Sequence, residues 1–381
     1  MLSTASPTRG EAILSSDNTF MPANPTLKEK ISQMLLIGFK GITLKPDDAI
    51  VRSILSQHIG GVILFDYDYQ SKIPDRNIQS PEQLRALTQQ LQTYAKQAAA
   101  VKQNDLFPLF IGIDYEGGKV NRLKEVYGFP PAPSAAEIGK GSPGAAQQQA
   151  EIMAVTLKKA GINLNFAPVL DVNVNPDNPA IVKLDRSFST DPQKVTNYAA
   201  IFAKAYRDHG ILCAYKHFPG HGSSTQDTHH TFVDVTDTWK EEELVPYQSL
   251  FKNPDTCSIV MTAHVVNRKY DDCPASISTP IITELLRNTL HFKGAVVTDD
   301  MQMKGITDRY GLALAVKMAV NAGADLLIFG NQLVTTPQDP EQVVNIIYDA
   351  VQAGEIKESR IDEAFGRISA LKIFLSAATH H

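Results

Sequence analysis

The segment at residues 216–230, KHFPGHGSSTQDTHH, concentrates side chains that could do chemistry: four His, one Lys and one Asp within fifteen residues. In one interpretation, His217, His221, Asp227 and His229 bind a metal ion. In a second, Lys216 and His217 bind a sugar or an anion, while Asp227 orients the His229 imidazole and stabilises its charged form for proton transfer near neutral pH. A third interpretation is a solvated polar loop, although such loops seldom hold this density of histidine. The chain has no HxH pair of the kind with which metal-dependent barrel hydrolases usually begin, and this weakens the metal interpretation.

Two adjacent carboxylates, Asp299 and Asp300, close the run GAVVTDD. A carboxylate at a strand end can attack a substrate carbon or bind a metal, but Asp at this position also often caps a helix. Successive side chains of a strand point to opposite sides. We therefore expect one of the two to face a site and the other to cap or brace.

Other polar residues admit both a functional and a structural interpretation. Asp114 and Glu116 precede a Gly-Gly turn, with Arg122 a few residues on, and Arg186 follows an Asp in a later loop. Carboxylates and guanidinium groups recognise substrate hydroxyls, but they also pair with each other to hold a loop. For two further residues we expect a packing role: His264 and Trp239.

The elements that must position these residues alternate along the chain. Eight short apolar runs, of the kind that form strands buried on both faces, occur at residues 35–39, 61–65, 109–114, 162–172, 211–218, 258–265, 294–300 and 324–330. Helical patterns are expected at 81–103, 143–160, 191–209 (with Thr190 as the N-cap), 240–252, 279–291, 309–322, 339–352 and 358–376. This order predicts an α/β fold, a single-domain (β/α)8 TIM barrel over residues 26–376, with an open doubly wound sheet as the alternative. In such barrels the active site lies at the carboxyl ends of the strands, and nearly every run here ends in polar residues.

Composition limits the function classes. The chain has 381 residues, 43% hydrophobic and 20% charged, with a net charge of −5. These values are typical of a folded globular protein and make nucleic acid a poor candidate partner. No apolar run is long enough to span a membrane. We expect residues 1–25, rich in Ser, Thr, Pro and Asn, to form a flexible arm, and we assign no chemistry to His380 and His381.

The cysteines bear on the compartment. An odd count of three, Cys213, Cys257 and Cys273, without a CxxC pair, argues against a disulfide framework and a structural zinc site. A reducing, cytoplasmic location fits this best. The N-terminus as written is not a signal peptide, and a periplasmic or cell-envelope location is the alternative if a signal peptide was removed.

With these residues identified, the sequence over about residues 26–370 resembles glycoside hydrolase family 3, in particular its single-domain bacterial β-N-acetylglucosaminidases. The resemblance rests on IGIDYEGGKVNRL, FAPVLDV, DRSFSTDP, KHFPGHG with a downstream D-x-H, MTAHV and VVTDDMQM, in that order. It implies a TIM barrel and an exo-acting, retaining β-N-acetylglucosaminidase of cell-wall recycling that acts on a small carbohydrate or muropeptide. It further implies that the reaction needs no metal or organic cofactor, and we expect a monomer.

The resemblance also implies the role of each site residue. Asp299 is the expected nucleophile, and His229 is the expected acid/base with Asp227 as its partner. The positions expected to bind the terminal sugar are Asp114, Arg122, Arg186, Lys216 and His217. Because the acid/base lies on a loop of small residues, we expect the loop to move over bound substrate.

This sequence departs from the family pattern in two places: the loop reads DTHH rather than the commoner DSH, and Lys119 stands where Arg is more frequent. Within the family, a β-glucosidase or β-xylosidase and a β-N-acetylglucosaminide phosphorylase are the alternatives. Met301, rather than Trp, follows the Asp pair, and this disfavours the glucosidase. Outside the family, the alternatives are a metal-dependent barrel hydrolase and an inactive sugar-binding barrel.

Overall fold

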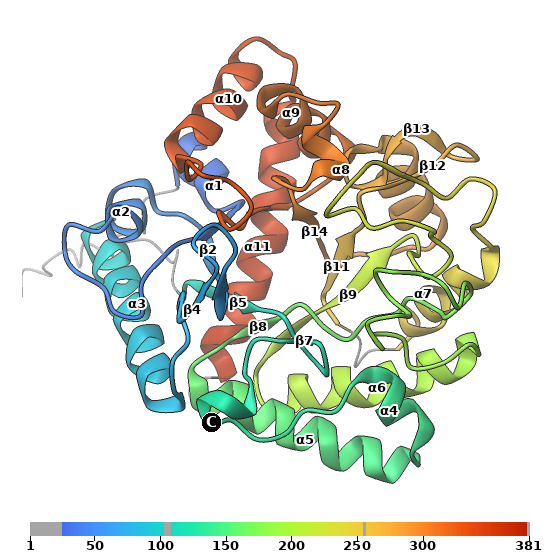
Figure 1. Ribbon diagram of the computed structural model, residues 1–381. Helices are drawn as coiled ribbons and strands as arrows, with labels where there is room; N and C mark the ends of the chain where they lie inside the picture. The colour runs from blue at the N-terminus through green and yellow to red at the C-terminus, as the bar shows by residue number, and fades with distance from the viewer. Residues whose placement is uncertain (1–24, 103–107, 254–256, 379–381) are drawn as a thin grey trace, which may run out of the picture.

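The computed structural model describes residues 25–102, 108–253 and 257–378. In this part of the chain, eight parallel strands close into a barrel in the order β1-β15-β14-β11-β9-β8-β5-β2 (Figure 1). Their bounds are Leu35–Gly38 (β1), Gly61–Leu64 (β2), Phe110–Ile113 (β5), Leu164–Asn165 (β8), Leu212–Phe218 (β9), Ile259–Thr262 (β11), Ala295–Asp300 (β14) and Leu326–Phe329 (β15). The predicted TIM barrel is confirmed, and the open doubly wound sheet is wrong. Residues 1–24 of the predicted arm, and the terminal His380 and His381, lie outside the described residues.

The barrel strands coincide with the apolar runs because both of their faces are covered. All four residues of β1 and all four of β15 are buried. The fourth strand is much shorter than the run at 162–172: β8 ends at Asn165, and Pro168, three residues on, has no N–H to give to a ladder. The chain rejoins its neighbour only through an isolated bridge between Val169 and Lys216.

Helices surround the barrel, and the predicted segments are found with shifted ends. The main ones are α3 (Pro81–Lys102), α5 (Pro143–Ala160), α6 (Pro192–Asp208), α7 (Val245–Leu250), the π-helix η5 (Pro280–Thr289), α9 (Leu312–Ala322), α10 (Pro340–Gln352) and α11 (Glu358–Ala378). Shorter helices are α1 (Leu27–Ser32), α2 (Ala49–Arg52), α4 (Ala135–Lys140) and α8 (Lys304–Thr307). The expected N-cap Thr190 is wrong. Asp191 caps α6 by accepting a hydrogen bond from the Gln193 amide, and Pro192 takes the first helical position.

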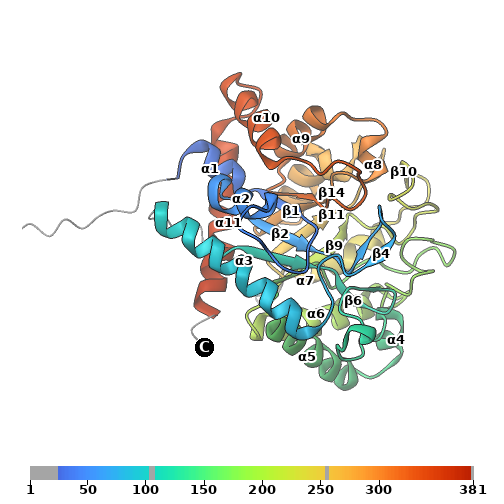
Figure 2. The ribbon, with the colours of Figure 1, turned by 60° about the vertical axis from the view of Figure 1, so that its left-hand side comes forward.

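The last helix, α11, packs against the amino ends of the strands (Figures 1 and 2). The amino group of its buried Lys372 lies 5.0 Å from the ring centre of Phe110, the first residue of β5. Arg367, also on α11, pairs at 3.0 Å with the buried Asp325, which directly precedes β15. These contacts cover the amino end of the barrel, so a substrate has to approach from the carboxyl ends of the strands.

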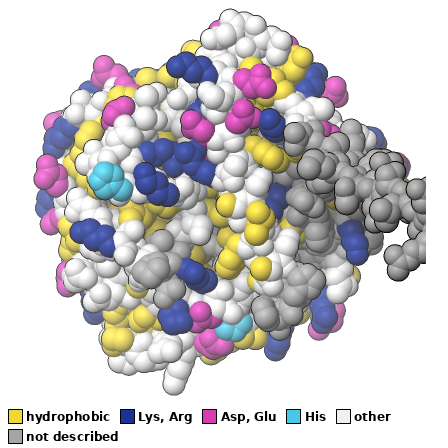
Figure 3. Space-filling view, turned by 180° about the vertical axis from the view of Figure 1, so that it is seen from behind, with side chains coloured by type: hydrophobic (Ala, Val, Ile, Leu, Met, Phe, Trp, Pro, Cys, Tyr) yellow, Lys and Arg dark blue, Asp and Glu magenta, His cyan; other side chains and the backbone are white. Residues whose placement is uncertain are grey.

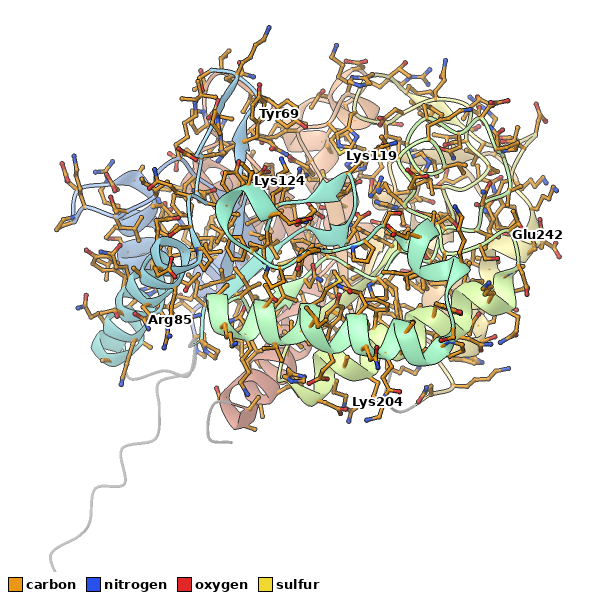
Figure 4. The ribbon with its side chains drawn as sticks, turned by 60° about the horizontal axis from the view of Figure 1, so that its bottom comes forward. Tyr69, Arg85, Lys119, Lys124, Lys204 and Glu242 are labelled. Atoms are coloured by element: carbon orange, nitrogen blue, oxygen red, sulfur yellow. A yellow bond between two sulfur atoms is a disulfide. The ribbon has the colours of Figure 1, made fainter. Side chains whose placement is uncertain are left out.

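Small sheets that the sequence analysis did not predict follow several barrel strands at that carboxyl end. They are β3 and β4 (Tyr67–Asp68, Ile73–Pro74), β6 and β7 (Tyr115–Gly117, Val120–Asn121), and β10, β12 and β13 (Val233–Asp234, Val265–Asn267, Asp271–Pro274). Their loops form a rim. Tyr69, Lys119 and Lys124 lie along it, away from Arg85 and Lys204 on the outer helices (Figure 4).

The expectation about the cysteines is wrong. Cys213, in β9, forms a disulfide with Cys257, which lies just before β11, and Cys273 is free. The two bonded cysteines are 44 residues apart in sequence, but β9 and β11 are neighbours in the barrel. An odd count of cysteines carries no information about which of them the fold brings together, and the argument for a reducing compartment therefore fails.

No helix among the described residues is long and apolar enough to cross a membrane. On the face seen in Figure 3, basic and acidic side chains are interspersed rather than gathered by sign.

Candidate active site

A cavity of about 450 Å³ opens at the carboxyl ends of the barrel strands. This volume lies within the range usual for small-molecule sites. Every residue that the sequence analysis assigned to the site lines the cavity: Asp114, Arg122, Arg186, Lys216, His217, Asp227, His229 and Asp299. The fold thus brings together side chains that are up to 185 positions apart in the sequence, the separation of Asp114 and Asp299.

The floor of the cavity is a buried ion cluster centred on Glu116, a residue noted in the sequence but not assigned to the site. Arg186 binds its two carboxylate oxygens through Nε and Nη2, each at 2.8 Å. Lys216 Nζ lies 2.6 Å from Glu116 Oε1 and 2.7 Å from Asp114 Oδ1. Burial raises the pKa of Glu116, but the charges of Arg186 and Lys216 outweigh this and hold it well below its usual range. The cluster fixes both cations in the absence of a ligand.

Arg122 lies at the side of this cluster. Its Nη2 is 3.7 Å from Asp114 Oδ2, and its Nη1 is 3.8 Å from Asp66 Oδ1. The guanidinium carbon also lies 5.7 Å from the ring centre of Phe65. Both ion-pair distances are long, so the Arg122 guanidinium keeps donors available for a ligand.

The second residue that the sequence analysis did not assign to the site is Asp171, after the fourth strand. Its carboxylate accepts hydrogen bonds from His217 Nδ1 at 2.6 Å and from the His221 amide at 2.8 Å. Arg186 has only donors, so its Nη2, 3.2 Å from His217 Nε2, donates to that nitrogen. The proton of His217 is thereby assigned to Nδ1, and the ring is held from both sides.

His221 turns away from the cavity. Its Nδ1 lies 2.7 Å from Ser224 Oγ, and burial lowers its pKa to about 4. Among the described residues, no group of three or more His, Cys, Asp or Glu is arranged to hold a metal ion. The interpretation that placed His217, His221, Asp227 and His229 around a metal therefore has no support in this geometry.

The predicted dyad forms at the cavity wall. His229 Nδ1 lies 2.8 Å from Asp227 Oδ1, which also accepts from the His229 amide at 2.9 Å. The imidazole is 48% exposed, so its other nitrogen, Nε2, can reach a ligand. Burial lowers the pKa of His229, but the hydrogen bond to Asp227 and the charge of Asp299 outweigh this and raise it. Although the loop is expected to move, here it holds His229 at the same cavity as Asp299.

The two adjacent carboxylates both line the cavity but differ in their surroundings. Asp299 is partly exposed at the cavity, and its Oδ1 accepts from the Asp300 amide at 2.8 Å. Burial raises the pKa of Asp299, but the nearby imidazoles, His264 foremost, outweigh this and lower it. Asp300 is buried, and its Oδ1 accepts from the amides of Gln302 and Gly330 at 3.0 and 3.2 Å. Burial raises the pKa of Asp300 to about 7, so Asp300 carries less negative charge than Asp299.

Two packing predictions are confirmed. His264 is fully buried, with Nδ1 2.6 Å from Ser276 Oγ and Nε2 2.9 Å from the Asp300 carbonyl. Trp239 is buried, and its indole N–H donates to the Pro219 carbonyl at 3.1 Å. Through these contacts the two residues support the loops that carry the site and are not part of its wall.

Comparison with known proteins agrees with this geometry. The family described as glycosyl hydrolase family 3 N terminal domain matches residues 26–371. Beta-hexosaminidase A of Pseudoalteromonas piscicida is 33% identical over an alignment of 351 residues, and the match covers 87% of this chain and 55% of that protein. Beta-hexosaminidase LpqI of Mycobacterium tuberculosis is 32% identical over an alignment of 365 residues, and the match covers 92% of this chain and 84% of the relative. The chain therefore spans little more than half of one relative and most of another.

Solved structures give the same result. A glycoside hydrolase family 3 beta-N-acetylglucosaminidase from Paenibacillus sp. str. FPU-7 superposes with a TM-score of 0.82 at 34% identity, over 93% of this chain and 63% of that one. Beta-N-acetylhexosaminidase from Beutenbergia cavernae superposes with a TM-score of 0.79 at 27% identity, over 92% of this chain and 99% of that one. From its matched motifs, its barrel and these relatives, the chain belongs to glycoside hydrolase family 3.

Proposed function

We propose that this chain is a retaining exo-β-N-acetylglucosaminidase that hydrolyses terminal β-linked N-acetylglucosamine, with Asp299 as the nucleophile and His229 as the acid/base. One observation carries the proposal. A carboxylate with a lowered pKa and an imidazole with a raised pKa line the same cavity, so the anionic form of Asp299 and the protonated form of His229 are both favoured there. A retaining glycosidase requires this pair of groups.

In the first step, an Asp299 oxygen attacks the anomeric carbon while the bond to the leaving oxygen breaks. The leaving oxygen takes the proton from His229 Nε2, because Nδ1 is bound to Asp227. The products are a glycosyl-aspartate ester and a free alcohol. In the second step, neutral His229 takes a proton from water, the water oxygen bonds to the anomeric carbon, and the ester bond breaks. Two inversions give net retention.

The imidazole suits this double role because its ordinary pKa is close to neutrality. Asp227 raises the pKa of His229 by binding the protonated ring, which favours the donor form in the first step. The nearby imidazoles, His264 foremost, lower the pKa of Asp299, which favours the attacking carboxylate. No metal is needed for either step.

We assign the terminal sugar to the floor of the cavity. Lys216 is held there by ion pairs with Asp114 and Glu116, and Arg186 by its ion pair with Glu116. Arg122 and His217 also line the cavity. Donors and acceptors fixed in advance bind hydroxyl and amide groups at a low entropic cost. Since these side chains are nearly buried, the floor is closed, and a closed floor favours removal of a single terminal residue.

We propose a cell-wall fragment as the natural substrate and a monomer as the working form. The Cys213–Cys257 disulfide supports an oxidising, extracytoplasmic compartment over a cytoplasmic one, because such bonds persist where thiols are not kept reduced.

The decisive experiment traps the intermediate with a fluorinated N-acetylglucosamine-type inactivator, followed by peptide mass mapping. We expect the label on Asp299, and a label on another side chain would refute the assignment.

The variant Asp299→Ala should lose turnover. A panel of aryl β-glycosides should rank the N-acetylglucosaminide above the glucoside and the xyloside. Full activity after dialysis against a chelator would remove the metal-dependent alternative, whereas loss that zinc restores would support it.

Phosphorolysis is the second candidate, and the His229 imidazole favours it. An anionic carboxylate in the acid/base position would repel phosphate, while an imidazole does not. Product analysis with and without inorganic phosphate distinguishes the two reactions. A sugar 1-phosphate as the major product would replace hydrolysis in this proposal.

A further inference from the structure

The loop that carries His229 is internally rigid over one turn. The amides of His230 and Thr231 both bind the Asp227 carbonyl, at 3.0 and 3.2 Å, and the His229 amide binds the Asp227 side chain. Asp227 and His229 therefore move as one body. What decides whether His229 reaches the substrate is how this turn is attached to the rest of the protein.

Two attachments join the turn to the segment that follows the nucleophile strand. The Gly305 amide, at the start of α8, donates to the Thr228 carbonyl at 3.1 Å. Just beyond the turn, the guanidinium carbon of Arg309 lies 3.4 Å from the ring centre of Phe232. The loop bearing the acid/base is thus tied to the segment that begins immediately after Asp299 and Asp300.

The approach at Gly305 requires the absence of a side chain. A Cβ placed there would lie 2.9 Å from His264 Cβ and 3.4 Å from the Thr228 carbonyl oxygen. Thr228 itself is 3% exposed, so the backbone contact is buried. Arg309, in contrast, is exposed, and Phe232 is half-buried. The stacked pair is therefore the outer, solvent-facing part of the attachment.

We propose that Phe232 and Arg309 form a latch that holds the loop of residues 225–232 over the cavity, and that both are positioning residues for protonation of the leaving group. The inference rests on the proposed function, because it takes His229 as the acid. Neither residue lines the cavity, so neither touches the substrate. They act through His229 alone, by favouring the closed position of the loop.

A latch predicts an effect that depends on the leaving group. When the leaving group is poor, cleavage needs the proton of His229, and every opening of the loop reduces the rate. When the leaving group is good, cleavage needs little protonation. A cation stacked on a ring at an exposed site is a weak but measurable contact. Losing it should lower the ratio of closed to open loop about two- to fivefold.

The test uses the full chain and two N-acetyl-β-glucosaminides, one with an alkyl and one with a dinitrophenyl leaving group. In Phe232→Leu and in Arg309→Ala, kcat on the alkyl glycoside should fall, by at most about two- to fivefold, while kcat on the dinitrophenyl glycoside stays at the wild-type value. The double variant should lose no more than either single one, since both remove the same contact. Phe232→Tyr, which keeps the ring, should retain the wild-type rate on both.

Lys194→Ala is the matched control, because Lys194 also faces an aromatic ring, that of Tyr198 at 5.6 Å, on the outer helix α6. It should leave both rates unchanged. Equal losses on the two glycosides in the latch variants, or no loss on either, would overturn the latch. So would a Phe232→Tyr variant as impaired as Phe232→Leu. If Phe232→Leu fails to fold, the exposed Arg309→Ala carries the test. A wild-type chain that cleaves neither glycoside would refute the proposed function instead.

Discussion

Glu116 holds the floor of the active site together, and its removal should be costly. It is 3% exposed and binds both Arg186 and Lys216, while Asp114 supplies the second negative charge. The substitution Glu116→Gln keeps the volume but leaves two buried cations with one carboxylate. Breaking a buried pair in this way costs about 3–5 kcal/mol. For a folded unit of roughly 350 residues, this corresponds to a fall in Tm of about 4–7 °C.

The assay is thermal unfolding of a double-mutant cycle with Lys216→Met. The double variant removes one charge of each sign, so it should regain most of the stability that Glu116→Gln loses. It should not regain activity, because Lys216 lines the cavity. Glu242→Gln is the control: Glu242 is 45% exposed at the edge of the molecule (Figure 4), and its loss should change stability by no more than about 0.5 kcal/mol. A Glu116→Gln variant as stable as the wild type, or a double variant no better than the single, would refute the reasoning.

Three further predictions concern the dyad and the disulfide. Asp227→Asn removes the negative charge that helps to raise the pKa of His229, so the alkaline limb of the pH profile of kcat/KM, where the protonated acid is lost, should move to lower pH; an unmoved limb would contradict this. His229→Ala should lose more rate on substrates with poor leaving groups than on activated aryl glycosides, and equal losses would count against His229 as the acid. Replacing Cys213 and Cys257 by Ala opens a loop of 44 residues and should lower the free energy of unfolding by about 4 kcal/mol, or Tm by about 5 °C, with activity at 25 °C retained. Denaturation curves of the two proteins under non-reducing conditions would test this, and coincident curves would be evidence against it.

The barrel was predictable because its signal is local. A strand covered on both faces must be apolar throughout, as in β1 and β15, and eight such runs alternating with helices leave few folds to choose from. The prediction failed where one residue overrode the pattern. The fourth strand ended at Asn165, before the Pro168 that its apolar run contains, and Asp191 rather than Thr190 capped α6. The small rim sheets have only two to four residues per strand, too few to carry a periodic signal.

The site was predictable to the same extent, since polar residues that directly follow buried strands must gather at one end of a parallel barrel. Asp299, Lys216 and His217 fall under this rule. Glu116 and Asp171 also follow barrel strands, but from the sequence alone their carboxylates could equally have held a loop in place. Only their contacts reveal that they orient Arg186 and His217.

Local order along the chain determined the elements, the end of the barrel at which chemistry occurs, and the residue types available there. Tertiary structure alone decided the pairings. Glu116 meets Arg186 across 70 positions, Asp171 meets His217 across 46, and Cys213 meets Cys257 across 44. The physical reason is that the pattern of apolar and polar side chains reports which side of its own strand or helix each residue buries. Ion pairs, hydrogen bonds and disulfides instead depend on which distant segments the closed barrel places side by side.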